Sequence, residues 1–546
     1  MTGLSSLMHS PRLIRNIQAQ LTGTMPSASK LGFLPLGRCR WLLHTGRGVS
    51  VSQGRAVAGA AVGAVGEEKK MKTFEDLPGP SLLTNIYWVF LRGYILYTHE
   101  LQAIYKKNYG PMWKSTLGRY KTVNIADVDI LETVLRQEGK YPMRSDMEVW
   151  KEHRRQRDLS LGPFTEEGHK WHTLRSVLNK RMLKPAEAML YTGVVNEVVT
   201  DFLVRLEEMR SETPSGDMVN DIPNALYRFA FEGISYILFE TRIGCLEKQI
   251  PVETQRFIDS IGAMLKNSIF VTIFPPWTNN LLPYYKRYMD SWDNIFAFGN
   301  KLINEKMKKI EARLERDEEV QGEYLTYLIS SGKLTDKEIY GSVAELLLAG
   351  VDTTSNTLSW ALYHLAREPE IQNALYQEVI GVVPGQNIPT SEDMSSMPLL
   401  RAVIKETLRL YPVVPTNSRV AVEKAITIGD YYFPKDTLIA LHHYHISRDE
   451  KNFPESDKFI PQRWFRESRV KNNPFSSIPF GYGVRACVGR RIAELEMHMC
   501  LSRIIKKYEV RPDPSGAEIK SMARIVLTPH KPINLRFLPR TPSPSA

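Results

Sequence analysis

A single helical pattern near the middle of the chain sets a minimum size for the fold. Thr335 and Glu338 have the spacing of a capping box, and the pattern that follows contains no proline up to about Leu365. A helix of these 31 residues is expected to be about 45 Å long, at roughly 1.5 Å per residue, which is enough to cross a whole domain. The chain is therefore expected to form a large domain built around this helix.

Other elements follow from the same kind of pattern. Pro369 and Pro398 each begin a further helix, and helical periodicity dominates from about residue 76 to about residue 410. Strand-like alternation appears only after that, in a short hairpin over residues 425–433 and a strand over residues 437–441. These patterns predict a mainly α fold with small β-sheets.

The first 66 residues differ from the rest of the chain in charge. They contain seven Arg or Lys residues and no Asp or Glu, so the formal net charge of +11 leaves only +4 for the remainder. This predicts a cleaved mitochondrial presequence over residues 1–66 and a single domain over residues 67–546, with a disordered basic tail as the alternative for the first segment. The remaining charge is too small to indicate nucleic acid as a partner.

A glycine-rich loop near the C-terminus places one cysteine in an unusual setting. Residues 480–489 contain three glycines, Arg485 and Cys487, directly before a helix that begins near Arg490. Backbone N–H groups in such a turn and a helix N-terminus are expected to lower the pKa of the thiol and to stabilise a thiolate ligand. The alternative is a small buried cysteine without chemistry, which is the interpretation we give to Cys500.

The order Phe-x-x-Gly-x-Arg-x-Cys-x-Gly in this loop resembles the heme-binding signature of the cytochrome P-450 family. The resemblance covers about residues 76–538 and implies a heme-thiolate monooxygenase with heme b between the long helix and the loop. It makes Cys487 the iron ligand, with Phe480 over the sulfur side of the porphyrin and Arg485 at a propionate. The other propionate contacts that it implies are Trp171, Arg175 and Arg419.

Two further stretches resemble motifs of the family. Glu406 and Arg409 share one face of the helix that Pro398 begins, and Arg463 lies in a later Pro-x-Arg loop. Such a pair also occurs on many solvated helices, but the resemblance implies a buried network of the three behind the heme. In the long helix, it makes Asp352 and Thr353 the residues that deliver protons.

Small and β-branched residues stand at the centre of the long helix, where they are unfavourable. We expect the Thr353 hydroxyl to bond the carbonyl oxygen of Ala349 and, with Gly350, to open a local groove for oxygen and water. A glycine that only packs against another helix, beside surface threonines, is the alternative. A zinc site at His442, His443 and His445 is disfavoured because no third ligand of another type lies nearby, so these are interpreted as surface or packing histidines.

Electrons have to come from a partner, since the chain contains no Gly-x-Gly-x-x-Gly fingerprint for a flavin or a nicotinamide. The resemblance to the mitochondrial branch of the family implies a [2Fe–2S] ferredoxin with its NADPH-dependent reductase. Arg401 and Lys405, one helical turn apart, resemble the basic pair that docks the ferredoxin. A solvated charged face is the alternative interpretation of this pair.

No run of 18–20 apolar residues occurs that would indicate a transmembrane helix. Residues 269–285 are apolar and aromatic, are followed by Lys286 and Arg287, and are interpreted as a loop between two helices that is either core or dips into a membrane. With the presequence, this predicts peripheral attachment to the matrix side of the inner mitochondrial membrane.

Several segments, including residues 138–142 and 412–419, resemble mitochondrial members of the family that hydroxylate sterol side chains. The resemblance implies oxidation of the terminal methyl group of cholesterol and bile-acid precursors, with vitamin D 25-hydroxylation as a further activity. A vitamin D or retinoid hydroxylase of the same branch and a non-catalytic heme or sterol carrier are the alternatives. The pocket residues that the resemblance implies are Val413, Val414, Thr416, Asn417, Ile525 and Val526.

Overall fold

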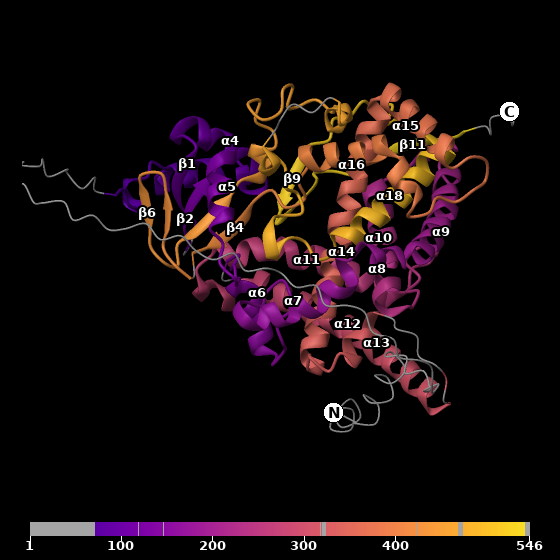
Figure 1. The fold of residues 1–546 in the computed structure, drawn as a ribbon, viewed down its shortest axis with the longest axis horizontal. Helices are drawn as coiled ribbons and strands as arrows, with labels where there is room; N and C mark the ends of the chain where they lie inside the picture. Colours follow the sequence, from indigo (N-terminus) through magenta and orange to yellow (C-terminus); the bar gives the residue numbers. More distant parts are fainter. Residues whose placement is uncertain are drawn as a thin grey trace, which may run out of the picture.

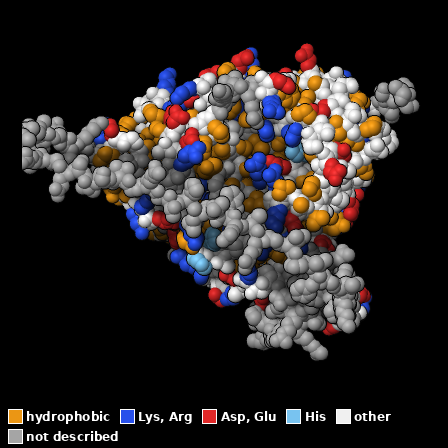
Figure 2. All heavy atoms as spheres, viewed as in Figure 1, with side chains coloured by type: hydrophobic (Ala, Val, Ile, Leu, Met, Phe, Trp, Pro, Cys, Tyr) orange, Lys and Arg blue, Asp and Glu red, His pale blue; other side chains and the backbone are white. Residues whose placement is uncertain are grey.

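The computed structural model describes residues 71–540 except residues 118–119, 146, 317, 319–323, 422 and 468–472. The expected presequence, residues 1–66, lies outside these ranges. Figure 1 shows a helix-rich part on the right and, on the left, a smaller part with most of the sheet strands. On the face drawn in Figure 2, hydrophobic and charged side chains are mixed, and several Lys and Arg side chains gather near its middle.

Helices make up most of the described chain, as predicted. In chain order they are α3 (Leu82–Ile86), α4 (Thr98–Tyr109), α5 (Val128–Arg136), α6 (Glu148–Gln156), α7 (Gly168–Met182), α8 (Pro185–Met189), α9 (Thr192–Ser211), α10 (Ile222–Phe239), α11 (Val252–Ile273), α12 (Pro283–Glu315), α13 (Tyr324–Ser330), α14 (Asp336–Arg367), α15 (Pro369–Val382), α16 (Pro398–Leu410), α17 (His443–Ile446) and α18 (Arg490–Lys507).

The strands form small sheets. They are β1 (Met112–Leu117), β2 (Tyr120–Ile125), β3 (Met218–Val219), β4 (Asn417–Val420), β5 (Ile426–Ile428), β6 (Tyr431–Phe433), β7 (Leu438–Leu441), β8 (Tyr508–Pro512), β9 (Ser521–Arg524), β10 (Val526–Pro529) and β11 (Leu535–Pro539). The largest sheet has the order β1-β2-β7-β4, another has the order β3-β11-β8, and β9 with β10 and β5 with β6 form antiparallel pairs.

The long helix α14 is the centre of the helical part. Its predicted capping box is present, because the Thr335 hydroxyl accepts a hydrogen bond from the N–H of Glu338 and the Glu338 carboxylate accepts one from the N–H of Thr335. The helix ends at Arg367, two residues beyond the predicted end, and packs against α10, α12, α16 and α18. Most of its residues are therefore buried, and it holds the surrounding helices in one core.

Two sequence-based expectations about secondary structure are wrong. Residues 112–125 contain the antiparallel pair β1 and β2, in a region where only helices were predicted. The stretch 269–285 is not a loop throughout, since α11 continues to Ile273 and α12 begins at Pro283. In the first case β2 pairs in parallel with β7, so a strand more than 300 residues later stabilises it.

Candidate active site

The cysteine loop is a closed turn that contains a short 3-10 helix, η8 (Gly483–Arg485), and leads into α18. The backbone N–H of Cys487 donates a 2.8 Å hydrogen bond to the carbonyl oxygen of Phe480, and the N–H of Gly481 donates one to Ile478. Gly481 and Gly483 have φ of 75° and 69°, a region that other residues rarely adopt. The glycines thus allow the tight turn that positions Cys487 directly before α18.

Burial raises the pKa of the Cys487 thiol. The Gly489 N–H and the guanidinium groups of Arg175, Arg144 and Arg490 oppose that rise. The expectation that this loop lowers the thiol pKa is therefore wrong for the polypeptide by itself, because desolvation outweighs the helix terminus and the arginines. A bound metal cation removes the thiol proton outright, so the donor set still fits a thiolate ligand for iron.

Arg485 ties the loop to distant parts of the chain. Its Nε donates a 2.7 Å hydrogen bond to the carbonyl oxygen of Pro142, and its Nη2 donates one of 3.1 Å to that of Glu166. Its guanidinium also lies 3.9 Å from the centre of the Trp171 ring of α7. The structure thus brings together Arg485 and Trp171, two of the residues that the sequence assigned to propionate binding.

Four arginines gather beside Cys487 with few carboxylates to balance them. Burial lowers the pKa of Arg144 and Arg175 to about 10 and that of Arg485 to about 9. Neighbouring guanidinium groups contribute to this lowering for Arg144 and Arg485. The fourth, Arg419, forms an ion pair with Glu138. An arginine cluster of this kind is suited to bind anionic groups.

Three buried donors in this cluster lack a hydrogen-bond partner: the Nε atoms of Arg144 and Arg175 and the Nε1 of Trp171. Buried donors without partners are unfavourable, so a carboxylate group placed here gains both charge pairing and hydrogen bonds. These residues therefore fit the propionates of a heme. Sequence reasoning missed Arg144, because it belongs to no motif and joins the cluster only through the fold.

Glu406 is the hub of a buried network, as expected. Its carboxylate accepts hydrogen bonds from Arg409 Nε at 2.9 Å, from Arg463 Nε at 3.0 Å and from Trp464 Nε1 at 2.8 Å. Arg409, which is fully buried, also donates to the carbonyl oxygens of Ser447, Ser456 and Lys458. The network joins α16 to the loops that follow β7, so it braces the framework of the fold.

The centre of α14 has one face that other side chains do not cover. Ala349 is exposed, and Asp352 and Thr353 are half-buried, although their neighbours are buried. The Thr353 hydroxyl donates a 2.8 Å hydrogen bond to the carbonyl oxygen of Ala349, as the sequence predicted. Burial raises the pKa of Asp352 to about 7, and the charge of Arg524 opposes that rise.

Gly350 serves helix packing. A Cβ atom at this position would lie 2.7 Å from Cγ1 of Ile234 on α10, so only glycine allows the two helices to approach this closely. The helix-packing alternative therefore holds for the glycine, and the groove stays a prediction. Thr353 keeps its predicted bond independently of this.

The residues expected to line a substrate pocket differ in exposure. Val414 and Ile525 are each 40% exposed, whereas Val413 and Val526 are 7% and 9% exposed. The N–H of Leu527 donates to the carbonyl oxygen of Val413, which places the β9–β10 turn beside the 412–417 segment. The side chains of Thr416 and Asn417 are engaged elsewhere, Thr416 with Gln102 and His442 and Asn417 with Ser418 and Arg419.

Arg401 and Lys405 are exposed on α16, one turn apart as predicted. Arg401 donates a 3.2 Å hydrogen bond to the carbonyl oxygen of Ser395, and the amino group of Lys405 lies 5.8 Å from the centre of the Trp464 ring. Because Trp464 contacts Glu406, the pair lies directly outside the buried network.

The three histidines that follow β7 are packing residues. His442 and His443 are buried, and burial lowers the pKa of both, as well as that of His445, to between about 3 and 4. His442 stacks on Trp113 with the ring centres 5.1 Å apart. Within the described ranges, no three His, Cys, Asp or Glu residues are grouped to hold a metal ion.

An exposed apolar surface lies at the α11–α12 connection. Trp277 and Leu281 are 69% and 70% exposed, while Tyr284 is buried and hydrogen-bonded to Thr278. The described part of the chain contains no helix that is long and apolar enough to cross a membrane.

The sequence profile of the cytochrome P450 family matches residues 78–537. The chain belongs to the cytochrome P450 family. It is therefore a heme-iron monooxygenase, and the predicted fold class is confirmed. A solved structure, the heme domain of cytochrome P450DA, aligns with a TM-score of 0.71 over 87% of this chain and 98% of that chain at 20% identity, which shows the shared P450 fold.

Relatives within the P450 family are much more similar in sequence. The mitochondrial sterol 26-hydroxylase of Homo sapiens is 51% identical over 93% of this chain and 99% of its own length, and that of Rattus norvegicus is 54% identical over 87% and 90%. The mitochondrial 25-hydroxyvitamin D-1 alpha hydroxylase of Homo sapiens is 41% identical over 88% and 96%. The chain thus groups with mitochondrial P450 enzymes.

Proposed function

We propose that this P450 hydroxylates the terminal methyl group of sterol side chains, in cholesterol and in bile-acid precursors, with vitamin D 25-hydroxylation as a further activity. The observation that carries the proposal is the 48–54% identity to four mitochondrial sterol 26-hydroxylases, against 40–41% for the vitamin D 1 alpha hydroxylases. A vitamin D or retinoid hydroxylase is the second candidate and has the weaker sequence support.

The cofactor in this proposal is heme b, whose iron Cys487 would hold, with Phe480 beside it in the same loop. The donors of Trp171, Arg144 and Arg175 that have no described partner support propionate binding. Arg485 and Arg419 complete the set of propionate contacts. When bound, heme iron supplies oxygen activation and the oxidising power to attack a C–H bond, and a thiolate ligand favours O–O cleavage.

The residues of α14 hold and move protons in this proposal. The Thr353 hydroxyl donates its hydrogen bond to the carbonyl oxygen of Ala349. Its oxygen is therefore left to accept a hydrogen bond on the exposed side of the helix. With a pKa of about 7, the Asp352 carboxyl gains and loses a proton readily near neutral pH, which suits a general acid.

Selectivity for a terminal methyl group requires positioning, since a primary C–H bond is harder to break than the neighbouring tertiary one. We assign this task to Val414 and Ile525, apolar residues that are each 40% exposed. Both residues lie in segments that contact each other through Val413 and Leu527.

The electron donor in this proposal is a mitochondrial [2Fe–2S] ferredoxin, reduced by its NADPH-dependent reductase, which docks on Arg401 and Lys405. Residues 1–66 direct import, and residues 67–546 form the heme monooxygenase domain. We place the enzyme on the matrix side of the inner membrane. The exposed Trp277 and Leu281 support peripheral contact with that membrane and uptake of sterol from it.

The decisive experiment supplies the purified holoenzyme with ferredoxin, reductase and NADPH, and offers a panel of sterols and secosteroids. We expect side-chain alcohols oxidised at the terminal methyl group to dominate, identified by mass spectrometry and NMR. Dominant ring hydroxylation, or turnover of secosteroids alone, contradicts the sterol assignment, and binding without turnover supports a carrier.

A further inference from the structure

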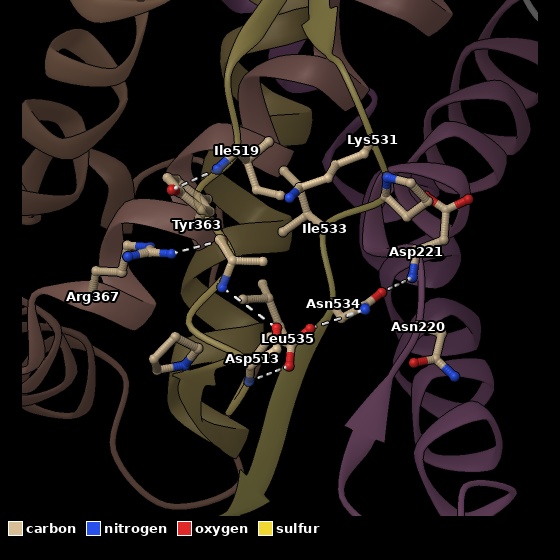
Figure 3. Close-up of a pocket in the computed structure, with 14 residues that line it drawn as sticks. Asn220, Asp221, Tyr363, Arg367, Asp513, Ile519, Lys531, Ile533, Asn534 and Leu535 are labelled. Atoms are coloured by element: carbon tan, nitrogen blue, oxygen red, sulfur yellow. Dashed lines mark hydrogen bonds between the residues drawn. The ribbon is translucent and has the colours of Figure 1, made fainter.

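A cavity of about 500 Å³ lies far from the candidate active site (Figure 3). Its walls are the start of α10, the end of α14, the β8–β9 connection and the segment that leads into β11. Arg367 lines this cavity. It comes 14 residues after Thr353 on α14, so it lies about 21 Å further along the helix. The cavity is therefore separate from the proposed heme and substrate sites.

Hydrogen bonds join its walls to one another, as the dashed lines in Figure 3 show. The N–H of Ile519 donates to the Tyr363 hydroxyl at 3.2 Å, which links the β8–β9 connection to α14. On the opposite side Asn534 donates to Asp513 at 3.1 Å and accepts from the N–H of Asp221 at 3.1 Å. The cavity is thus preformed, and a ligand does not have to order its walls.

The floor of the cavity is apolar. Tyr363 and Ile519 are each 7% exposed, and Ile533 and Leu535 are each 1% exposed. The volume falls in the range of roughly 300–1,000 Å³ that is usual for small-molecule sites, which are apolar with a few placed polar groups. The floor therefore suits the apolar body of a small ligand.

Two cations line the cavity and form no ion pair with a described carboxylate. Figure 3 shows the Lys531 side chain reaching toward the centre of the cavity, above Ile533. Arg367 donates a 3.0 Å hydrogen bond to the carbonyl oxygen of Ala517, and its guanidinium lies 4.6 Å from the centre of the Tyr363 ring. Both cations can therefore meet a negatively charged ligand group.

The lining also contains two carboxylates, Asp513 and Asp221. Asp513 accepts hydrogen bonds from the N–H of Ser515 at 2.9 Å and from Asn534, and these bonds lower its pKa. Burial raises the pKa of Asp221, whose side chain lies directly before α10, in the right half of Figure 3. The charge of Lys531 also lowers the pKa of Asp513, although the two side chains form no ion pair.

We propose that this cavity binds a small carboxylate with an apolar body. Its carboxylate pairs with Lys531, with Arg367 as a second cation at the rim, and its apolar part covers Ile533 and Tyr363. The two features needed are the free amino group and the preformed apolar floor, which the structure places side by side.

The test measures binding of octanoate to the full-length holoenzyme by saturation-transfer NMR, with octanamide as the neutral counterpart. We expect octanamide to bind at least about fivefold more weakly, because it lacks the charge that Lys531 recognises. Lys531→Glu should weaken octanoate binding by about fivefold or more, whereas Lys435→Glu, an equal change of net charge at an exposed lysine on the β6–β7 turn, should change it by less than about twofold.

Ala517→Leu, which fills part of the cavity, should weaken the binding of octanoate and octanamide alike. If Lys531→Glu lowers the heme content, octanoate binding to Ala517→Leu shows instead whether the cavity is the binding site. The Soret band should not respond to octanoate, because the site is remote from the heme. Equal octanoate affinity in Lys531→Glu and Lys435→Glu overturns the proposal. A Soret shift that tracks octanoate binding also overturns it, since the probe then occupies the substrate pocket.

Discussion

Arg175 of α7 donates a hydrogen bond to the carbonyl oxygen of Ala486, the residue before Cys487. The same helix presents Trp171 to the guanidinium of Arg485 in the cysteine loop. One face of α7 therefore fixes both the arginine and the cysteine of the loop. Changes in α7 are expected to alter heme binding although α7 contains no iron ligand.

Cys487→His should abolish the red-shifted Soret band that the reduced carbon monoxide complex of a thiolate-ligated heme shows. The imidazole replaces the anionic sulfur donor, so the electronic signature changes even if heme stays bound. Cys500→Ala is the matched control, because Cys500 is buried in α18 and burial raises the pKa of its thiol. Loss of the band in the Cys500 variant alone would refute the assignment.

Thr353→Ala should slow product formation by about ten- to hundredfold while NADPH consumption continues and peroxide is released. The hydroxyl bonded to Ala349 is lost, and proton transfer is then no longer directed. Thr357→Ala is a suitable control, since Thr357 makes the same bond one turn later, to the carbonyl oxygen of Thr353, but is buried. Equal coupling of electrons to product in both variants contradicts the role.

The half-buried carboxyl of Asp352 should make folding stability depend on pH. Its pKa is raised from 3.8 to about 7, so the folded protein binds more protons than the unfolded chain between these values. The contribution is most favourable below about pH 4 and is lost as the pH rises through about 7. Asp352→Asn should therefore flatten the pH dependence of urea unfolding between pH 4 and 7, relative to the parent; an unchanged slope would show that Asp352 is not the group responsible.

Charge reversal at both Arg401 and Lys405 should weaken ferredoxin binding by about tenfold and remove much of its salt dependence. Heme content should stay normal, because both side chains are exposed and lie outside the Glu406 network. The double reversal Lys435→Glu with Lys451→Glu, elsewhere on the surface, controls for net charge. Surface plasmon resonance at two salt concentrations measures both effects, and an unaltered affinity rejects this docking site.

Val414→Ala should relax selectivity toward the tertiary carbon of a sterol side chain. The substitution removes two methyl groups from a side chain that is 40% exposed and that we assign to the substrate pocket, so the substrate is held less closely. A methylene group in such a pocket is worth about 1–3 kcal/mol, so the product ratio should shift by about tenfold. Val413→Ala, at a buried neighbour, should change stability more than selectivity, and product analysis by NMR separates the two.

Local signals allowed much of the fold to be predicted. The capping box at Thr335, the prolines that begin α15 and α16 and the hairpin of β5 and β6 all depend on residues close in sequence. The pair β1 and β2 was missed because β2 is completed by β7, a contact that no short window contains.

The residues of the candidate site also divide into those with a local sequence signal and those that only the fold brings to the site. Short motifs that resemble those of the family indicated Cys487, Glu406 and Thr353. Arg144 enters the site from a loop that carries no motif, and the reason for Gly350 is Ile234 on another helix. The direction of the Cys487 pKa could not be predicted either, because the extent of burial depends on the assembled fold.

The arginine cluster beside Cys487 links cofactor supply to the lifetime of the protein. Without an anionic group, the guanidinium groups of Arg144, Arg175 and Arg485 stay desolvated, and this burial lowers the pKa of all three. Whatever neutralises them stabilises the folded state by mass action. Cells starved of heme should therefore degrade newly made chains faster, and the steady-state amount of this enzyme should follow porphyrin synthesis even at constant translation.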